Sequence, residues 1–140
     1  MTSTFHITKL FCPLLKASLG ASIINFSSIR SPLAFKGSGP YGMEKAGVES
    51  LTRTLAVELG DDRIRANAIL PGFIATETLL KKYNDVYLKG ALNQIPLNRM
   101  SDPSDIANLA CFLAMPASGY ISGQCIKIDG GFTSFGFGGI

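Results

Sequence analysis

The sequence predicts an α/β fold in which helices cover both faces of a parallel sheet. Three short apolar segments, at residues 21–26, 64–70 and 125–128, have the length and composition of buried strands. Longer segments with helical features separate them, so the order is helix, strand, helix, strand, helix, strand. With 140 residues, 46% hydrophobic and 16% charged, the chain is expected to form one globular domain over residues 1–140.

The first half of the chain contains two expected helices and one expected strand. Residues 3–19 place Phe5, Leu10 and Leu14 in a mostly helical pattern that Gly20 can end. Residues 21–26 (ASIINF) form a nearly continuous apolar run, which is typical of a strand buried on both faces. A loop rich in Gly, Ser and Pro follows. A long helix is then expected from Tyr41 to about residue 59, with one apolar stripe.

In the second half, residues 64–70 (IRANAIL) form a strand that should end at Pro71-Gly72, because a sheet interior does not tolerate this pair. Residues 77–98 are polar and weakly periodic, so one or two short surface helices are expected there. Residues 102–105 (DPSD) combine an N-cap, a proline at the first helical position and an early acid, which predicts a helix start. The third strand precedes Asp129, and residues 132–140 are expected to be ordered only by contacts.

The composition excludes several classes of function. The net charge of +3 comes from 13 basic and 10 acidic residues that are scattered along the chain, so no nucleic-acid partner is expected. Cys12, Cys111 and Cys125 lie far apart in apolar surroundings, without metal-ligand spacing to the one histidine, His6. We expect them to be reduced core residues in a reducing compartment and expect no metal; we also expect His6 to be a buried polar residue.

No apolar stretch reaches the roughly 18 residues that a membrane span needs, so the sequence predicts a soluble, cytoplasmic protein with no membrane partner. The first acidic residue is Glu44, and the basic opening of the chain leaves an organelle transit peptide as an alternative. We favour a place in the fold for these residues.

Tyr41 and Lys45 are the first candidate catalytic residues. They lie four positions apart on one expected helix, which puts them on the same face. A phenol has a reference pKa near ~10, too high for proton transfer at neutral pH, and a nearby ammonium group stabilises the phenolate. A tyrosine of this kind can donate a proton to a carbonyl oxygen that is being reduced. Four tyrosines and eight lysines would often give this spacing by chance, so the context decides.

That context is the spacing to two expected strand ends. Ser28 lies 13 residues before Tyr41, and Pro71 lies 30 residues after it. Ligands bind beyond the carboxyl ends of the strands in such sheets. Each feature alone also has a structural explanation: Ser28 as a turn residue, Tyr41 as a helix-start aromatic, Lys45 as a solvated charge, and Pro71-Gly72 as a strand stop.

The segments IINFSS, YGMEK, IRANAILPGFIATE and YISGQCIKIDGG resemble, in this order, the second half of the classical short-chain dehydrogenases/reductases. PLLKAS, LAVEL and DGGFTSFGFGG are similar to the tropinone reductase branch. The resemblance implies the last three strands and helices of a Rossmann-type, doubly wound parallel sheet, that is, a partial domain whose amino-terminal half is missing. It also implies an NAD(P)-dependent oxidoreductase that acts on a small-molecule ketone or alcohol.

The resemblance implies a role for each matching residue. Tyr41 would be the catalytic acid/base, Ser28 would polarise the substrate carbonyl, and Lys45 would favour the phenolate and hold the nicotinamide ribose. A set of four residues would line the nicotinamide, with the backbone of Ile74 meeting its carboxamide: Pro71, Gly72, Ile74 and Thr76. The segment after Thr76 would shape the substrate pocket. The branch favours NADP(H), and NAD(H) stays open.

Gly37, Gly39 and Gly42 spell G-x-G-x-x-G before a helix, but we reject a dinucleotide fingerprint here. The preceding strand ends nine residues earlier, and no acid ends the next strand. The family's Thr-Gly-x-x-x-Gly-x-Gly turn and its catalytic Asn are absent, so impaired activity is expected. We expect the chain to form a homo-oligomer or a hetero-oligomer with full-length relatives. The alternative function is that of a non-catalytic remnant that oligomerises with full-length relatives.

Overall fold

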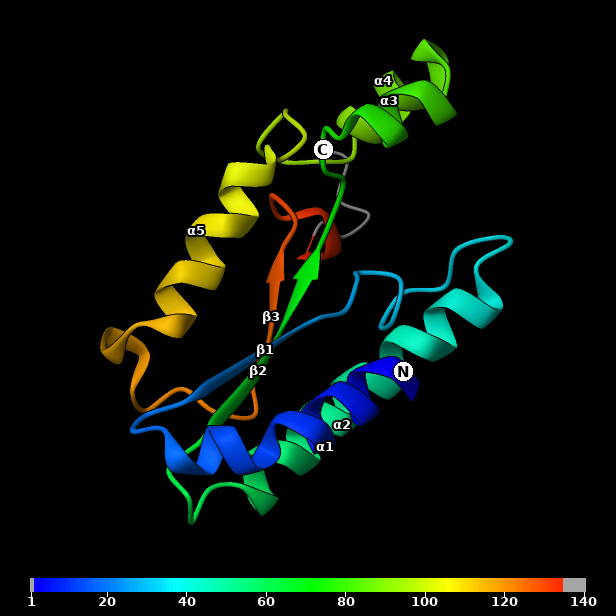
Figure 1. Ribbon diagram of the computed structural model, residues 1–140. Helices are drawn as coiled ribbons and strands as arrows, with labels where there is room; N and C mark the ends of the chain where they lie inside the picture. Colours follow the sequence, from blue (N-terminus) through cyan, green and yellow to red (C-terminus); the bar gives the residue numbers. More distant parts are fainter. Residues whose placement is uncertain (1, 135–140) are drawn as a thin grey trace.

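The computed structural model describes residues 2–134, which form a three-stranded parallel sheet between two layers of helices (Figure 1). The strands are β1 (Ser22–Phe26), β2 (Arg65–Pro71) and β3 (Cys125–Ile128), in that order across the sheet. Helices α1 (Thr2–Ala17) and α2 (Gly39–Glu58) lie on one face, and α5 (Pro103–Ala114) lies on the other. The short helices α3 (Glu77–Lys82) and α4 (Asp85–Leu92) lie beyond the carboxyl end of β2. The predicted α/β architecture is therefore confirmed.

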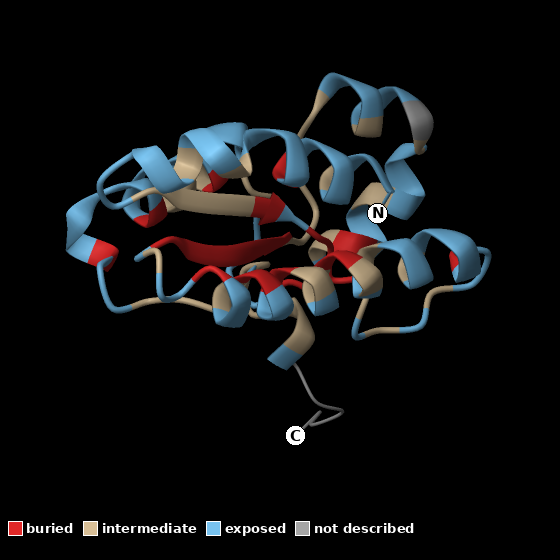
Figure 2. Cartoon of the chain, turned by 60° about the horizontal axis from the view of Figure 1, so that its bottom comes forward, coloured by how far each residue is buried: buried red, intermediate tan, exposed pale blue. Residues whose placement is uncertain are grey.

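Strand β2 is the centre of the core, and Figure 2 shows it in red along nearly its whole length. Successive side chains of a strand point to opposite faces, so β2 contributes to two apolar clusters. Ala66 packs toward α2 with Leu55 and Leu59, and Ile69 packs toward α5 with Ile106 and Leu113. The predicted apolar stripe on the long helix and the predicted helix after Asp102 are both confirmed, because both face these clusters.

Strand β1 occurs where it was predicted, but the expected burial on both faces is wrong. Asn25 is its one buried residue, and Phe26 is 49% exposed. Strand β1 pairs with β2 along one edge, in the parallel register that places Phe26 opposite Ile69. Its other edge has no partner strand among residues 2–134, which leaves its side chains closer to solvent.

The end of β2 and the start of α2 differ by one or two residues from the expected boundaries. Pro71 is the last residue of β2. Its carbonyl oxygen still takes part in the sheet, because it accepts a bond from the Ile29 N–H (3.2 Å). The missing N–H of proline is tolerated at this position because the strand ends there. Helix α2 begins two residues before Tyr41, with Pro40 in its first turn. Residues 77–98 contain α3 and α4, as predicted.

The expected core position of the cysteines holds only in part, and the expected burial of His6 is wrong. Cys12 is half-buried and packs against the cluster that contains Leu55, Cys125 is half-buried, and Cys111 is exposed on α5. All three are free thiols. His6 is exposed on α1, because this helix packs on the domain through residues near its carboxyl end, such as Leu15. Large apolar side chains consequently remain exposed on α1: Phe5, Ile7, Leu10, Phe11 and Leu14.

The last described residues contain little regular structure. The segment Phe132–Ser134 forms a single 3₁₀ turn, and the rest of the tail whose order was predicted lies outside the described residues. No helix within residues 2–134 is long and apolar enough to cross a membrane. In the same range, no group of three His, Cys, Asp or Glu side chains is arranged to hold a metal ion.

Candidate functional site

Ser28 is held at the carboxyl end of β1 by an extension of the sheet. The Ser27 N–H donates to the Ile69 carbonyl oxygen (2.8 Å), and the Ile29 N–H donates to that of Pro71 (3.2 Å). These bonds continue the pairing of β1 with β2 past the last strand residue. Ser28 is therefore rigidly placed, and it is only 9% exposed.

The Ser28 hydroxyl is available as a hydrogen-bond donor. Its oxygen accepts a bond from the Arg30 N–H (3.2 Å), and no acceptor for its proton occurs among the residues that the structure describes. The Ser28 carbonyl oxygen accepts a bond from the Ser31 N–H (3.0 Å), which closes the turn after the strand. A ligand oxygen can thus accept a hydrogen bond from the Ser28 hydroxyl without breaking a bond within the protein.

Tyr41 and Lys45 lie on the first two turns of α2, on one face as predicted. The Lys45 Nζ lies 5.6 Å from the centre of the Tyr41 ring and donates to the Phe26 carbonyl oxygen (3.0 Å). This contact fastens the start of α2 to the end of β1. The Tyr41 side chain is 44% exposed, so its phenol can be reached from outside.

A positioning network that the sequence interpretation missed connects the same two elements. The Ser27 hydroxyl donates to a Glu49 carboxylate oxygen (2.8 Å) and lies 3.1 Å from the Lys45 carbonyl oxygen. The Ser31 hydroxyl donates to the same Glu49 oxygen. Glu49 lies four residues after Lys45 and faces a Ser-Ser pair at a strand end, and this spacing is the signal that was available in the sequence.

Ser28 and Tyr41 line one cavity of about 480 Å³ beyond the carboxyl ends of β1 and β2. Of the predicted cofactor residues, Gly72 and Thr76 also line it. The described lining contains the following residues: Ser28, Ile29, Arg30, Phe35, Gly37, Ser38, Tyr41, Gly72, Phe73, Thr76, Thr78, Leu79 and Tyr83. The structure thus brings together four of the predicted site residues.

Three predicted site residues lie beside the cavity and are absent from its described lining. Lys45 lies one helical turn beyond Tyr41, and Pro71 is held in β2. Ile74 forms a parallel bridge to Ser101 and packs against the core on the α5 side. The segment after Thr76, expected to shape the pocket, supplies side chains from α3 and from the residue that follows it.

The end of β2 packs tightly against Asp129. A Cβ atom added at Gly72 would lie 2.8 Å from the Asp129 Cβ, so this strand end requires glycine. Burial raises the pKa of Asp129, but hydrogen bonds from Thr133 and Gly131 and the charge of Lys127 lower it more. The net result is a pKa below the usual value, and the carboxylate caps the turn after β3 with bonds from the Gly131 N–H (3.0 Å) and the Thr133 N–H (2.9 Å).

Comparison with known proteins identifies the family. A family model described as enoyl-(acyl carrier protein) reductase matches residues 1–133. Two tropinone reductase homologs of Arabidopsis thaliana are 40% identical over 140 residues and 42% identical over 136 residues. The chain belongs to the short-chain dehydrogenase/reductase (SDR) family. The alignments cover 98% and 96% of the chain but 52% and 44% of these relatives, so this SDR chain spans about half of their length.

Solved SDR structures superpose closely on the described fold. A 7α-hydroxysteroid dehydrogenase in complex with NADH and 7-oxoglycochenodeoxycholic acid has a TM-score of 0.90 at 33% identity, over 94% of this chain and 51% of that one. A gluconate 5-dehydrogenase from Burkholderia cenocepacia, in complex with NADP and tartrate, has a TM-score of 0.88 at 28% identity, over 95% and 52%. The arrangement of β1 to β3 and their helices is therefore the SDR arrangement.

Proposed function

We propose that this SDR chain carries the carbonyl-binding and proton-donating part of an NADP(H)-dependent reductase of the tropinone reductase type. Such an enzyme reduces a ketone and, in reverse, oxidises the alcohol. One observation carries the proposal: Ser28 and Tyr41 come from separate segments and line the same cavity, with Lys45 beside the Tyr41 ring. Hydroxyl groups that converge on one cavity suit the polarisation of a carbonyl oxygen.

The proposed roles follow from the hydrogen-bonding capacity of each group. Ser28 donates a hydrogen bond to the carbonyl oxygen of the substrate and keeps its proton. Tyr41 transfers its phenolic proton to the same oxygen as negative charge develops there. Lys45 stabilises the phenolate that Tyr41 becomes. The nicotinamide, when bound, supplies the hydride that attacks the carbonyl carbon. The hydrogen bonds of Glu49 to Ser27 and Ser31 hold Ser28 and Tyr41 at a fixed distance from each other, because they connect the loop after β1 to α2.

The cavity beside Tyr41 could accommodate the nicotinamide ring. Gly72 and Thr76 form its wall beside Tyr41, and Pro71 and Ile74 fix the course of that wall. One SDR structure holds NADH and another holds NADP, which supports a nicotinamide cofactor here. The proposed preference for NADP(H) over NAD(H) comes from the resemblance of the sequence to the tropinone reductase branch. The sequence lacks the family's glycine turn for the phosphates, so we propose weak cofactor binding and impaired turnover by the 140-residue chain.

A titration with matched variants tests this function. We expect saturable quenching of NADPH fluorescence by the 140-residue chain, with slow ketone reduction. Tyr41→Phe and Lys45→Ala should each lower turnover by about 10²-fold or more, because both act on one proton transfer. The controls are Tyr120→Phe, at a fully exposed tyrosine outside the cavity, and Lys89→Ala on α4. Unchanged turnover in Tyr41→Phe would overturn the assignment of the site.

The second candidate is a non-catalytic chain that assembles with a copy of itself or with a full-length SDR relative. The exposed apolar residues on α1 favour it, because an apolar surface of this kind commonly marks an interface. Leu14→Lys should then abolish assembly in analytical ultracentrifugation. Leu97→Lys is the matched control, since Leu14 and Leu97 are both 66% exposed. Loss of assembly in both variants, or in neither, would count against α1 as the interface.

We also propose a cytoplasmic location. Three cysteines that are all free thiols suit a reducing compartment. A fluorescent fusion at the carboxyl end should give a diffuse cytoplasmic signal, whereas accumulation in an organelle would contradict the proposal.

A further inference from the structure

Arg30 is the one charged residue in the described lining of the cavity, and it lies two residues after Ser28. Its Nη1 donates to the Ser38 hydroxyl (2.9 Å), and its guanidinium carbon lies 5.1 Å from the centre of the Phe35 ring. No ion pair joins Arg30 to a carboxylate within residues 2–134. The cavity therefore contains a positive charge without an acidic partner.

The position of the Arg30 guanidinium is largely fixed before any ligand binds. The Phe35 ring supports the guanidinium, and Phe35 in turn stacks on Phe132 at a distance of 6.2 Å between ring centres. A guanidinium has five N–H donors, and Ser38 accepts one of them. The remaining donors have no acceptor among residues 2–134, and a guanidinium binds a carboxylate with two parallel hydrogen bonds.

The amino-terminal end of α2 adds a second source of positive potential on the same side. Gly37 and Ser38 precede this 20-residue helix and line the cavity. The Ser38 hydroxyl accepts the bond from Arg30 and makes no capping bond to the first turn of α2, which contains no acidic residue. The first N–H groups of the helix thus retain their partial positive charge.

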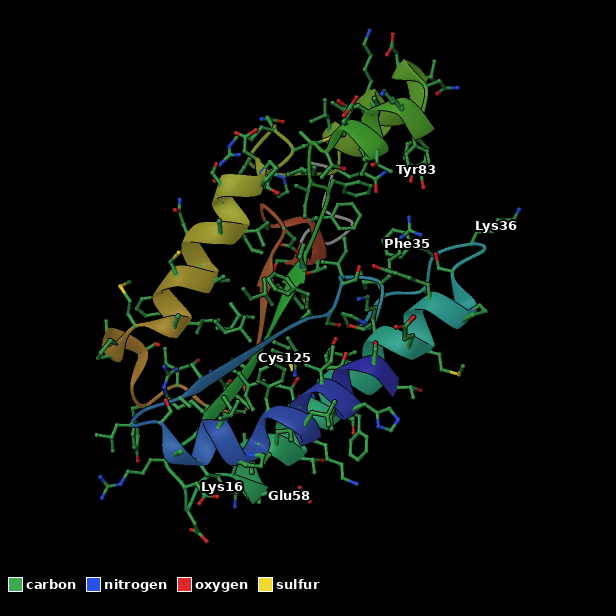
Figure 3. The ribbon with its side chains drawn as sticks, viewed as in Figure 1. Lys16, Phe35, Lys36, Glu58, Tyr83 and Cys125 are labelled. Carbon is green, nitrogen blue, oxygen red and sulfur yellow. The ribbon has the colours of Figure 1, made fainter. Side chains whose placement is uncertain are left out.

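Apolar side chains form part of the remaining wall, together with Thr76 and Thr78. Phe35 comes from the loop between β1 and α2, and Phe73 comes from the loop between β2 and α3. Leu79 lies in α3, and Tyr83 follows it. Figure 3 shows Phe35 on the loop that precedes α2 and Tyr83 on the opposite side, next to α3. Lys36 points outward at the tip of the loop that carries Phe35. This wall suits an aromatic or aliphatic body attached to the carbonyl group.

We propose that the carbonyl substrate of this site is an oxo acid whose carboxylate pairs with Arg30. Its carbonyl oxygen lies at Ser28 and Tyr41, and its apolar part lies against Phe35 and Phe73. This inference rests on the proposed carbonyl site and adds the charge of the substrate to it. Arg30 is then a specificity-determining residue, because a neutral ketone leaves its donors without an acceptor.

Matched probes and variants test the charge requirement by binding. The probes are 4-oxo-4-phenylbutanoate and its neutral methyl ester, and the readouts are NMR titration and the side-chain Nε–H signal of Arg30. We expect the acid to bind about tenfold tighter than the ester at low salt, as for a charge-assisted pair at a partly exposed site. Arg30→Met should remove this preference and leave the affinity for the ester within about twofold.

Lys36→Met is the control for overall charge, since it removes the same charge from the same loop at an exposed residue outside the cavity lining. It should retain the preference for the acid. If Arg30→Met is misfolded, the unaltered chain still decides: added salt should weaken binding of the acid and leave that of the ester unchanged.

Three outcomes contradict the inference. Equal affinities for acid and ester would overturn it and leave the proposed ketone site intact. An acid preference that Lys36→Met and Arg30→Met both remove to the same extent would assign the effect to the overall charge of the loop and not to Arg30. Failure of both probes to bind would overturn the oxo-acid inference together with the proposed carbonyl site.

Discussion

Replacing Gly42 by alanine tests how closely the loop after β1 packs on α2. Gly42 lies next to Tyr41 in the first turns of the helix, and a Cβ atom added there would lie 2.6 Å from the Arg30 carbonyl oxygen. That oxygen belongs to the backbone, so it cannot swing aside as a side chain can. The Arg30 backbone is fixed further by the bond from its N–H to the Ser28 hydroxyl (3.2 Å).

The expected magnitude follows from two opposing effects. Glycine in a helix interior is destabilising by about 0.5–1 kcal/mol relative to alanine, so helix propensity alone favours Gly42→Ala. Overpacking at a fixed contact costs about 1–3 kcal/mol, because the loop and the helix must separate. The contact should dominate, with a net loss of about 1 kcal/mol in the free energy of unfolding. The separation also moves Ser28 away from Tyr41.

Urea unfolding followed by circular dichroism measures this change. Gly90→Ala is the matched control, because Gly90 lies in α4 and an added Cβ would meet no atom within 4 Å. Gly90→Ala should raise the urea midpoint and Gly42→Ala should lower it, each by about 0.3–1 M for a typical urea dependence. If Gly42→Ala raises the midpoint as Gly90→Ala does, the inferred close approach of Arg30 is incorrect.

Two further predictions concern polar groups that are hydrogen-bonded within the fold. Thr52→Val should lower the free energy of unfolding by about 1–3 kcal/mol, because it leaves the buried Asn25 amide, now 2.9 Å from the Thr52 hydroxyl, without an acceptor. Thr54→Val, on the same helix but exposed, should change it by less than about 0.5 kcal/mol, and equal losses in urea unfolding would refute the reasoning. The pKa of Asp129 is lowered in the folded chain, since hydrogen bonds outweigh the opposing effect of burial. The ionised carboxylate therefore stabilises the fold at every pH above its unfolded pKa near 3.8. This contribution is lost as the pH falls through the lower pKa of the folded chain. Asp129→Asn should therefore flatten the decline of the thermal midpoint below about pH 4, and an unchanged acid decline would show that Asp129 does not contribute to it.

Local chemistry explains which parts of the fold could be predicted. The helix at Asp102-Pro103 and the strand at residues 125–128 are defined by caps, proline and apolar runs within a few neighbouring residues, and both occur as predicted. The burial of β1 and of Cys111 was predicted wrongly, because burial depends on which elements pack against a segment. An apolar composition indicates a strand or a helix, but it does not say whether a neighbour covers it.

The sequence by itself determined the order of the elements, the family, and the placement of Tyr41 and Lys45 on one helical face, since a four-residue spacing on a helix is a local geometric property. Tertiary structure alone decided that Ser28, Gly72 and Thr76 meet Tyr41 at one cavity and that Lys45 lies beside it. It also decided the positions of Glu49 and Arg30. Their partners lie in an irregular loop without periodicity, and the folded contact between that loop and α2 brings them together.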